Sequence, residues 1–248
     1  MTDDPEPATS AIDPGTVNDS DPAYFTDDKG RRVCNITSDG MVRKIVITAN
    51  EDAPKVSDHI LGRVWINIKG TTNDGVVFID SLFEEKELCL GKAEQSKAVD
   101  QALTTMHHGD HALIQVHDVE KYGYSANKSP DGYPASNEQA DALPVRFEVA
   151  VMDSLPKQRQ SQEMTFKEQL EWADVLRERG NIRYEKRRFL TALSLYERAI
   201  RCLDAMNDVD MAMPAELAKE TKVSKDEVQS LKIKCYLNCS MYAHSHVF

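Results

Sequence analysis

The stretch Gly62–Lys69 reads GRVWINIK, and its Val64, Ile66 and Ile68 occupy every second position. This alternation predicts a β-strand with one buried face. Asn73-Asp74-Gly75 supplies a tight-turn signal after it, and a further strand follows to Phe78. The decisive stretch therefore predicts a β-hairpin within a half-buried sheet.

Similar patterns extend on both sides of this hairpin. Arg43–Ala49 (RKIVITA) and Ala112–Val116 are further strand candidates, and apolar residues alternate again at Val145, Phe147, Val149 and Val151. One short helix is expected between them, because Val99, Ala102, Leu103 and Met106 fall on one helical face. Five or six antiparallel strands with one helix predict an α+β fold, with the helix packed on one face of the sheet.

From about residue 160 the apolar period becomes helical. One stripe contains Phe166, Leu170, Ala173, Leu176, Gly180 and Tyr184, and a second contains Ala192, Tyr196, Ala199 and Leu203. A third helix is expected after Ser224, which forms a capping box with Glu227 and precedes the apolar positions Val228, Leu231, Cys235 and Tyr242. A loop containing Pro214 separates the second and third helices.

Composition narrows the class of protein. The 248 residues carry a net charge of −11, which disfavours nucleic-acid binding. Residues 1–22 hold several Asp and Glu but no Lys or Arg, and we predict a disordered acidic tail. The predicted β part then covers residues 23–156, with its core at 60–153, and the helical part covers residues 163–248. Neither an export signal nor a membrane-spanning run is present in the sequence, which favours a cytoplasmic location with reduced cysteines.

The helical part resembles a tetratricopeptide module. Gly180, Asn181, Tyr184, Phe189, Ala192, Tyr196 and Ala199 stand at the spacings of one such helix pair, and the next helix would begin a second repeat. By this resemblance Arg177, Asn181 and Asn238 would occupy positions of a clamp for the C-terminal carboxylates of heat-shock chaperones. An ordinary solvated role for Arg177 is an open alternative. The other basic clamp residues would come from a third repeat, whereas the sequence stops at Phe248 within the second, as expected for a truncated form.

The β part resembles the FKBP-type peptidyl-prolyl isomerase (rotamase) domain. The resemblance rests on Asn73-Asp74-Gly75 with Phe78, Leu90-Gly91-Lys92, Met106 and Gly109, Tyr122-Gly123, and Phe147. It implies an antiparallel sheet wrapped on one short helix and followed by the all-α repeat hairpin. The order of the two parts is similar to that of the large co-chaperone immunophilins, above all a subclass anchored to mitochondrial or endoplasmic-reticulum membrane; the anchor has no counterpart here.

Carried over residue by residue, the proline pocket of this family is only half present. Phe78, Tyr122 and Phe147 would be its aromatic walls, and Asp80 would replace an acidic neighbour with a shift of one residue. The floor tryptophan falls at Val99, and a wall tyrosine falls at Ile68. The aliphatic pair before the helix falls at Gln95 and Ser96, which would bring polar, hydrated groups to the apolar rim. Trp65 lies on the other face of its strand and cannot substitute for the floor. Plain core roles for Phe78 and Phe147 are an open alternative.

Two functions follow as expectations, and a regulatory fragment in which neither function is intact is an open alternative. The first is a co-chaperone or adaptor with a degenerate isomerase domain, which binds chaperone tails or other proteins through the repeat face. The second is a slow peptidyl-prolyl isomerase that acts on proline-containing peptides and assists protein folding. Twisting an X–Pro bond requires a dry pocket rather than a nucleophile, so no cofactor is expected. No metal site is expected either, because His107, His108, His111 and His117 lie on a predicted turn and strand without thiolate partners.

Overall fold

The computed structural model describes residues 23–56, 62–125, 128–137, 144–157, 163–208 and 223–245, with the backbone only at 207–208 and 242–245. The predicted acidic tail at residues 1–22 lies outside this part of the chain. So do residues 158–162 between the predicted β and helical parts, the loop containing Pro214, and the side chain of Tyr242.

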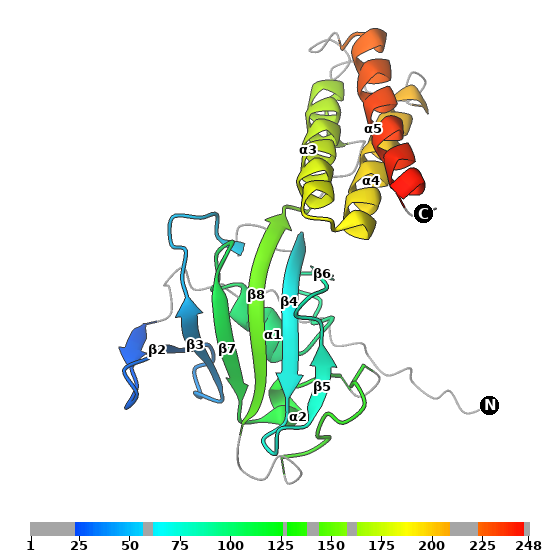
Figure 1. Ribbon diagram of the computed structural model, residues 1–248. Coiled ribbons are helices and arrows are strands. Elements are labelled where there is room, and N and C mark those ends of the chain that lie inside the picture. The colour runs from blue at the N-terminus through cyan, green and yellow to red at the C-terminus, as the bar shows by residue number, and fades with distance from the viewer. Residues whose placement is uncertain are drawn as a thin grey trace, which may run out of the picture.

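The described N-terminal part forms an antiparallel sheet of eight strands (Figure 1). The order across the sheet is β1-β2-β3-β7-β8-β4-β5, and β6 pairs with β4 beside β5. The strands are β1 (Tyr24–Thr26), β2 (Arg32–Asn35), β3 (Val42–Thr48), β4 (Arg63–Thr71), β5 (Val77–Asp80), β6 (Lys86–Cys89), β7 (His111–Val116) and β8 (Val145–Leu155). Each predicted strand is therefore present.

Strand β4 contributes side chains to two apolar cores, one on each face of the sheet. Val64, Ile66 and Ile68 are fully buried in the main core, as their alternation predicted. Trp65 is 1% exposed but packs in a second apolar cluster with Leu155 and the C-terminal helices. The prediction that Trp65 lies on the opposite face is thus confirmed.

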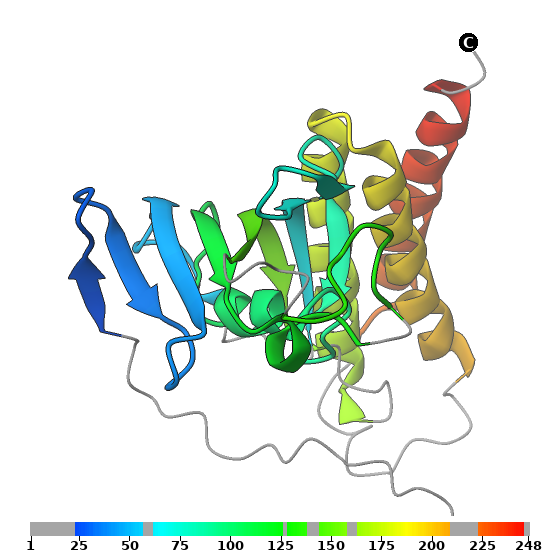
Figure 2. The ribbon, with the colours of Figure 1, turned by 90° about the horizontal axis from the view of Figure 1, so that it is seen from below.

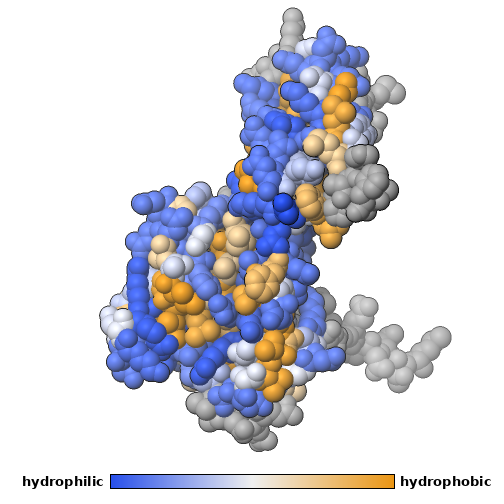
Figure 3. Space-filling model, in the orientation of Figure 1, coloured by the Kyte–Doolittle hydropathy of each residue, from blue (hydrophilic) through white to orange (hydrophobic). Residues whose placement is uncertain are grey.

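The predicted helix is α1 (Lys97–Leu103), and it covers the face of the sheet that carries the main core. Figure 2 shows the strands as one row with α1 and the short α2 (Val119–Tyr122) on the same side. On the opposite face, patches of hydrophobic residues lie among hydrophilic ones (Figure 3). The α+β architecture is confirmed.

Four elements were not predicted: β1, β2, β6 and α2. Each contains only three or four residues, which is too short to show a period of its own. The three strands among them form because neighbouring strands supply hydrogen-bond partners. Strand β2, for example, pairs with β3 from Val33 opposite Ile45. The predicted count of five or six strands was therefore too low.

Three packed helices follow the sheet: α3 (Phe166–Glu185), α4 (Phe189–Asp208) and α5 (Lys225–Ser245). A Cβ on Gly180 would lie 2.3 Å from the Tyr196 ring, so only glycine permits this close approach of α3 and α4. Thr165 and Glu168 form a capping box at the start of α3. Before α5, the Glu227 carboxylate accepts a hydrogen bond from the Ser224 amide, which is half of the predicted capping box; the Ser224 hydroxyl accepts from the amide of Asp226 instead.

A buried arginine joins the helices to the sheet. Arg183 of α3 is 1% exposed, and its guanidinium lies 3.1 Å from Asp153 and 3.3 Å from Glu85. It also lies over the Trp65 ring at 5.4 Å. The helices are thus attached to the sheet by apolar burial and by buried charges together.

Candidate functional site

Four aromatic rings meet at one place in the sheet domain. Phe78 of β5 packs edge-on against Phe147 of β8 and against Tyr133, with ring centroids 5.5 Å and 5.2 Å apart. Tyr124 packs edge-on against Tyr133 at 4.9 Å and lies 6.2 Å from Phe147. We call these four residues the ring cluster. Two of its members, Phe78 and Phe147, are predicted pocket walls.

Glycines shape the space around the ring cluster. A Cβ on Gly70 of β4 would lie 2.3 Å from the Phe78 ring, so this strand position accommodates the ring only because it lacks a side chain. A Cβ on Gly123 would lie 2.3 Å from the Tyr133 hydroxyl. The Tyr133 side chain therefore reaches back across the end of α2 and rests on Phe78.

The two tyrosines differ in their hydrogen bonds. The Tyr124 hydroxyl donates to Gln95 Oε1 at 3.0 Å, whereas the buried Tyr133 hydroxyl has no hydrogen-bond partner in the described part of the chain. Burial raises the pKa of both hydroxyls far above the usual value. Both hydroxyls are neutral at physiological pH, as those of ordinary tyrosines are, and the four rings contain neither a nucleophile nor a general base.

Three of the residues predicted for the pocket, Val99, Ile68 and Ser96, are fully buried. Val99 and Ile68 are fully buried within the same core as Phe78 and Phe147. Ser96 is also fully buried and is the N-cap of α1, its hydroxyl accepting from the Val99 amide at 3.1 Å. The expectation that Ser96 brings a hydrated group to the rim was wrong, because the hydroxyl is consumed by the helix terminus.

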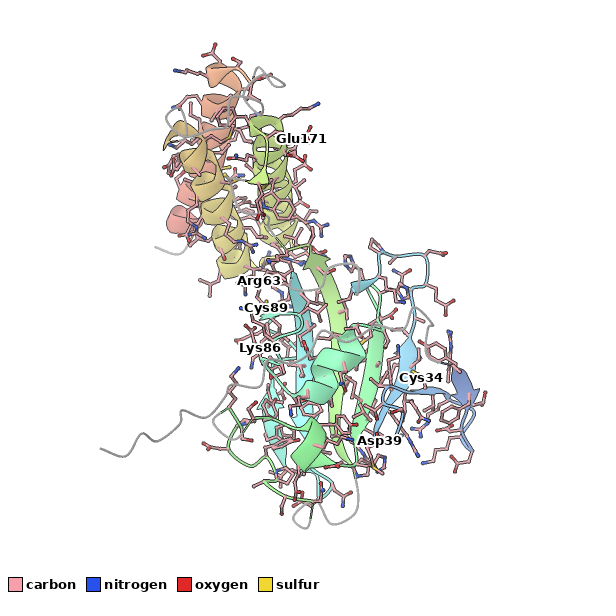
Figure 4. The ribbon with its side chains drawn as sticks, turned by 180° about the vertical axis from the view of Figure 1, so that it is seen from behind. Cys34, Asp39, Arg63, Lys86, Cys89 and Glu171 are labelled. Atoms are coloured by element: carbon pink, nitrogen blue, oxygen red, sulfur yellow. The ribbon has the colours of Figure 1, made fainter. Side chains whose placement is uncertain are left out.

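The polar groups of Tyr122 and Asp80 are bonded to residues outside the ring cluster. Tyr122 donates its hydroxyl to Asp39 Oδ2 at 2.7 Å, and Lys121 donates to the same oxygen at 2.8 Å. Asp39 lies at the end of the sheet farthest from helices α3–α5 (Figure 4). Asp80 is half exposed beside Lys69. Tyr122 is buried in the same core as Phe78 and Phe147 and fixes the loop before β3, while the Tyr124 ring packs in the ring cluster.

Sequence reasoning missed Tyr124 and Tyr133. Tyr124 comes directly after the Tyr122-Gly123 pair, so the motif lies next to a further ring that the pattern did not identify. Tyr133 lies in a loop without periodicity, and nothing in its local pattern indicates burial. Arg183 was also missed, although it follows Leu176 and Gly180 on the apolar stripe of α3. Because a charged side chain is almost never fully buried unless it is paired, an arginine on this stripe indicates a buried ion pair.

The predicted clamp residues fall into two groups. Asn181 Oδ1 accepts from Asn238 Nδ2 at 2.8 Å and from the Tyr196 hydroxyl at 3.0 Å, so α3, α4 and α5 are joined at this point. Together with Tyr184, Glu185 and Met241 these three residues line a cavity of about 180 Å³. Arg177 lies one turn earlier on α3, 17% exposed, and pairs with Asp174 at 2.7 Å. Asn181 and Asn238 are brought together, while Arg177 has an acidic partner on its own helix.

The histidines form no metal centre among the described residues. His107 lies 3.6 Å from Asp110, and His108 lies 3.5 Å from Asp153 with a hydrogen bond to Ser154. Both side chains are partly buried; His107 lies beside Asp110 of the same turn, whereas His108 is bonded to residues of β8. In the described residues, no helix has the length and apolarity needed to cross a bilayer.

Comparison with known proteins gives the sheet domain a family. Residues 57–152 match the family model described as FKBP-type peptidyl-prolyl cis-trans isomerase. Among curated proteins, the chain is 24% identical over 221 residues to peptidyl-prolyl cis-trans isomerase FKBP4 of Rattus norvegicus, which spans 86% of this chain and 42% of that protein. The human counterpart is 23% identical over 221 residues, spanning 86% of this chain and 41% of that protein. The chain thus spans about two fifths of the length of these relatives.

Solved structures include a multi-domain immunophilin from Arabidopsis thaliana, at 18% identity and a TM-score of 0.41, covering 90% of this chain and 79% of that chain. The three FKBP domains of wheat FKBP73 match at 21% identity and a TM-score of 0.42, covering 51% of this chain and 52% of that chain.

Proposed function

Because the chain carries an FKBP-type peptidyl-prolyl isomerase domain and is distantly related to FKBP4 over most of its length, we propose that it is a co-chaperone or adaptor. In this proposal the isomerase domain is degenerate, and the helices α3–α5 bind the partner. The observation that carries the proposal is the ring cluster, in which Tyr133 of the chain itself covers Phe78.

A proline ring needs an apolar surface that it can reach. Phe147 is fully buried and Phe78 is 9% exposed, so neither wall offers a free face. A substrate would have to expel Tyr133, which removes an aromatic ring from apolar contact. Such a loss costs roughly 1.5–3 kcal/mol, which weakens substrate binding about tenfold to a hundredfold.

The floor is changed as well. Val99 is fully buried, and the core around it contains side chains of α1 and the sheet in contact with one another. A tryptophan at this position would overpack the core, which costs about 1–3 kcal/mol or more. Restoring the aromatic floor by Val99→Trp is therefore expected to destabilise the domain rather than to activate it.

The helical face keeps groups that suit a carboxylate. Because Asn181 Oδ1 already accepts two hydrogen bonds, the side-chain amide hydrogens of Asn181 can donate to a ligand. Asn238 uses one amide hydrogen on Asn181 and has a second one to donate. Arg177 could pair with a carboxylate bidentately if it released Asp174. These properties support binding of a peptide that ends in a free acidic C-terminus, such as a heat-shock chaperone tail.

Fluorescence polarisation tests this binding. A labelled acidic peptide with a free C-terminal carboxylate is titrated with the protein, and the same peptide with an amidated C-terminus serves as the matched ligand. Arg177→Ala is compared with Lys167→Ala, a control on the same helix whose side chain is 66% exposed.

We expect micromolar binding that weakens about tenfold on amidation and in Arg177→Ala, because a charge-assisted pair is lost. Equal affinities for the free and amidated peptides, or for Arg177→Ala and the control, would contradict the clamp.

A slow isomerase is the second candidate. It is favoured by the retention of Phe78 and Phe147 as packed neighbours in the ring cluster. Tyr133→Ala separates the candidates, because removing the covering ring is expected to confer proline-peptide or tacrolimus binding only if the remaining pocket is sound. If Tyr133→Ala binds tacrolimus and the unmodified chain does not, the result supports a pocket that is covered by Tyr133. If the unmodified chain binds tacrolimus, the result favours the enzyme.

A further inference from the structure

A cavity of about 740 Å³ lies between the sheet and helix α4. The sheet side is made by the first residue of β4, the last residue of β6 and the turn that follows it, and the segment after β8. The helix side is made by one face of α4. Figure 4 shows Arg63 and Cys89 at this junction, at the ends of their strands nearest the helices.

The lining of this cavity is cationic in a chain whose net charge is −11. Among the described residues that line it, five are basic and one is acidic; the bases are Arg63, Lys92, Lys157, Arg198 and Arg201, and the acid is Glu87. With each side chain counted at its full charge, the described lining carries a net charge of +4. We call it the basic junction cavity.

The single acid does not neutralise the bases around it. Glu87 Oε1 lies 3.5 Å from Arg63 Nε and 3.4 Å from an Arg198 terminal nitrogen, so one oxygen serves two guanidinium groups at long range. The Arg198 side chain is only 16% exposed. Burial lowers its pKa, and the nearby charges of Arg63 and Arg201 lower it further, against the opposing effect of Glu87. Like charges are thus held close together in a sheltered space.

The chemistry of the lining selects the class of ligand. A volume of this size suits a small molecule, but the cavity has no aromatic side chain on which a base or a drug could stack. Arginine forks bind phosphate bidentately, and lysines add point charges around it. Several phosphates carried close together would match the charge excess better than one carboxylate.

We propose that the basic junction cavity binds a compact anion that carries several phosphate groups. Such a ligand would contact the sheet through Arg63 and α4 through Arg198 and Arg201. Binding would therefore fix the helices against the FKBP-type domain, and it uses none of the residues of the proposed carboxylate clamp.

Isothermal titration calorimetry on the full chain tests the proposal, with inorganic triphosphate and inositol hexakisphosphate as probes and sulfate at equal ionic strength as the reference anion. Arg201→Gln removes an exposed cation of the cavity, and Arg146→Gln, an exposed arginine of β8 away from the cavity, is the matched control.

We expect saturable binding of one polyphosphate per chain, tighter than sulfate, and an increase in melting temperature on binding. Arg201→Gln should weaken binding about tenfold, the usual effect of losing one charge-assisted contact, while Arg146→Gln leaves it unchanged. Equal affinities in the two variants, or polyphosphate binding no tighter than sulfate, would overturn the proposal. So would binding to a doubly phosphorylated peptide without binding to either probe.

Discussion

Replacing Arg183 by methionine tests how the helices are attached to the sheet. The substitution removes a guanidinium that lies 3.1 Å from Asp153 and 3.3 Å from Glu85, at a position that is 1% exposed. Asp153 retains Arg179 as a partner, but the Glu85 side chain, itself 1% exposed, would be left as a buried charge. Breaking a buried pair from one side costs about 3–5 kcal/mol, so we expect a loss of this size in the free energy of unfolding.

A second variant identifies the cause of that loss. In Arg183→Met/Glu85→Gln the neutral amide needs no counter-charge, and the double variant should be more stable than Arg183→Met alone by about 2 kcal/mol. Urea unfolding followed by circular dichroism and tryptophan fluorescence measures both values. Lys167→Met, at a side chain that is 66% exposed, is the control and should change stability by less than about 0.5 kcal/mol.

The reasoning would be refuted if Arg183→Met lost less than about 1 kcal/mol, or if the double variant were less stable than the single one. Either result would mean that apolar packing around Trp65 attaches the helices without help from the buried charges.

Two further predictions concern packing and pH. Gly180→Ala should destabilise the helices by about 1–2 kcal/mol, because the clash with the Tyr196 ring outweighs the gain in helix propensity; an equally stable variant in thermal unfolding would argue against this close approach. Burial, and secondarily the charge of Arg43, lowers the pKa of His117, so the folded chain binds fewer protons here than the unfolded chain. Its stability should therefore fall as the pH drops through about 6.5, and His117→Gln should show a smaller loss between pH 7.5 and pH 5.5. Parallel pH profiles of the two proteins would exclude this role.

The strands and helices could be predicted where a period repeats. The alternation of Val64, Ile66 and Ile68 is the direct consequence of a strand with one buried face, and Gly180 with Tyr196 marks a close helix crossing. Strands of three or four residues show no such period, so β1, β2 and β6 were missed.

The candidate site could be predicted only in part, because its residues come together through loops. Phe78 and Phe147 lie on strands and were found. Tyr133 approaches them from an irregular segment, and its position depends on the glycine at 123 and on packing that no local pattern reveals. Ser96 was misinterpreted for a related reason, since a serine before a helix serves the helix terminus before it serves a pocket.

The most direct test of the degenerate isomerase domain is a protease-coupled cis-to-trans assay on a short X–Pro peptide, with and without tacrolimus. Because Tyr133 covers Phe78 and the floor position holds Val99 rather than an aromatic residue, we expect no acceleration above the uncatalysed rate and no effect of tacrolimus. A clear acceleration that tacrolimus abolishes would contradict it and would identify the chain as an active peptidyl-prolyl isomerase.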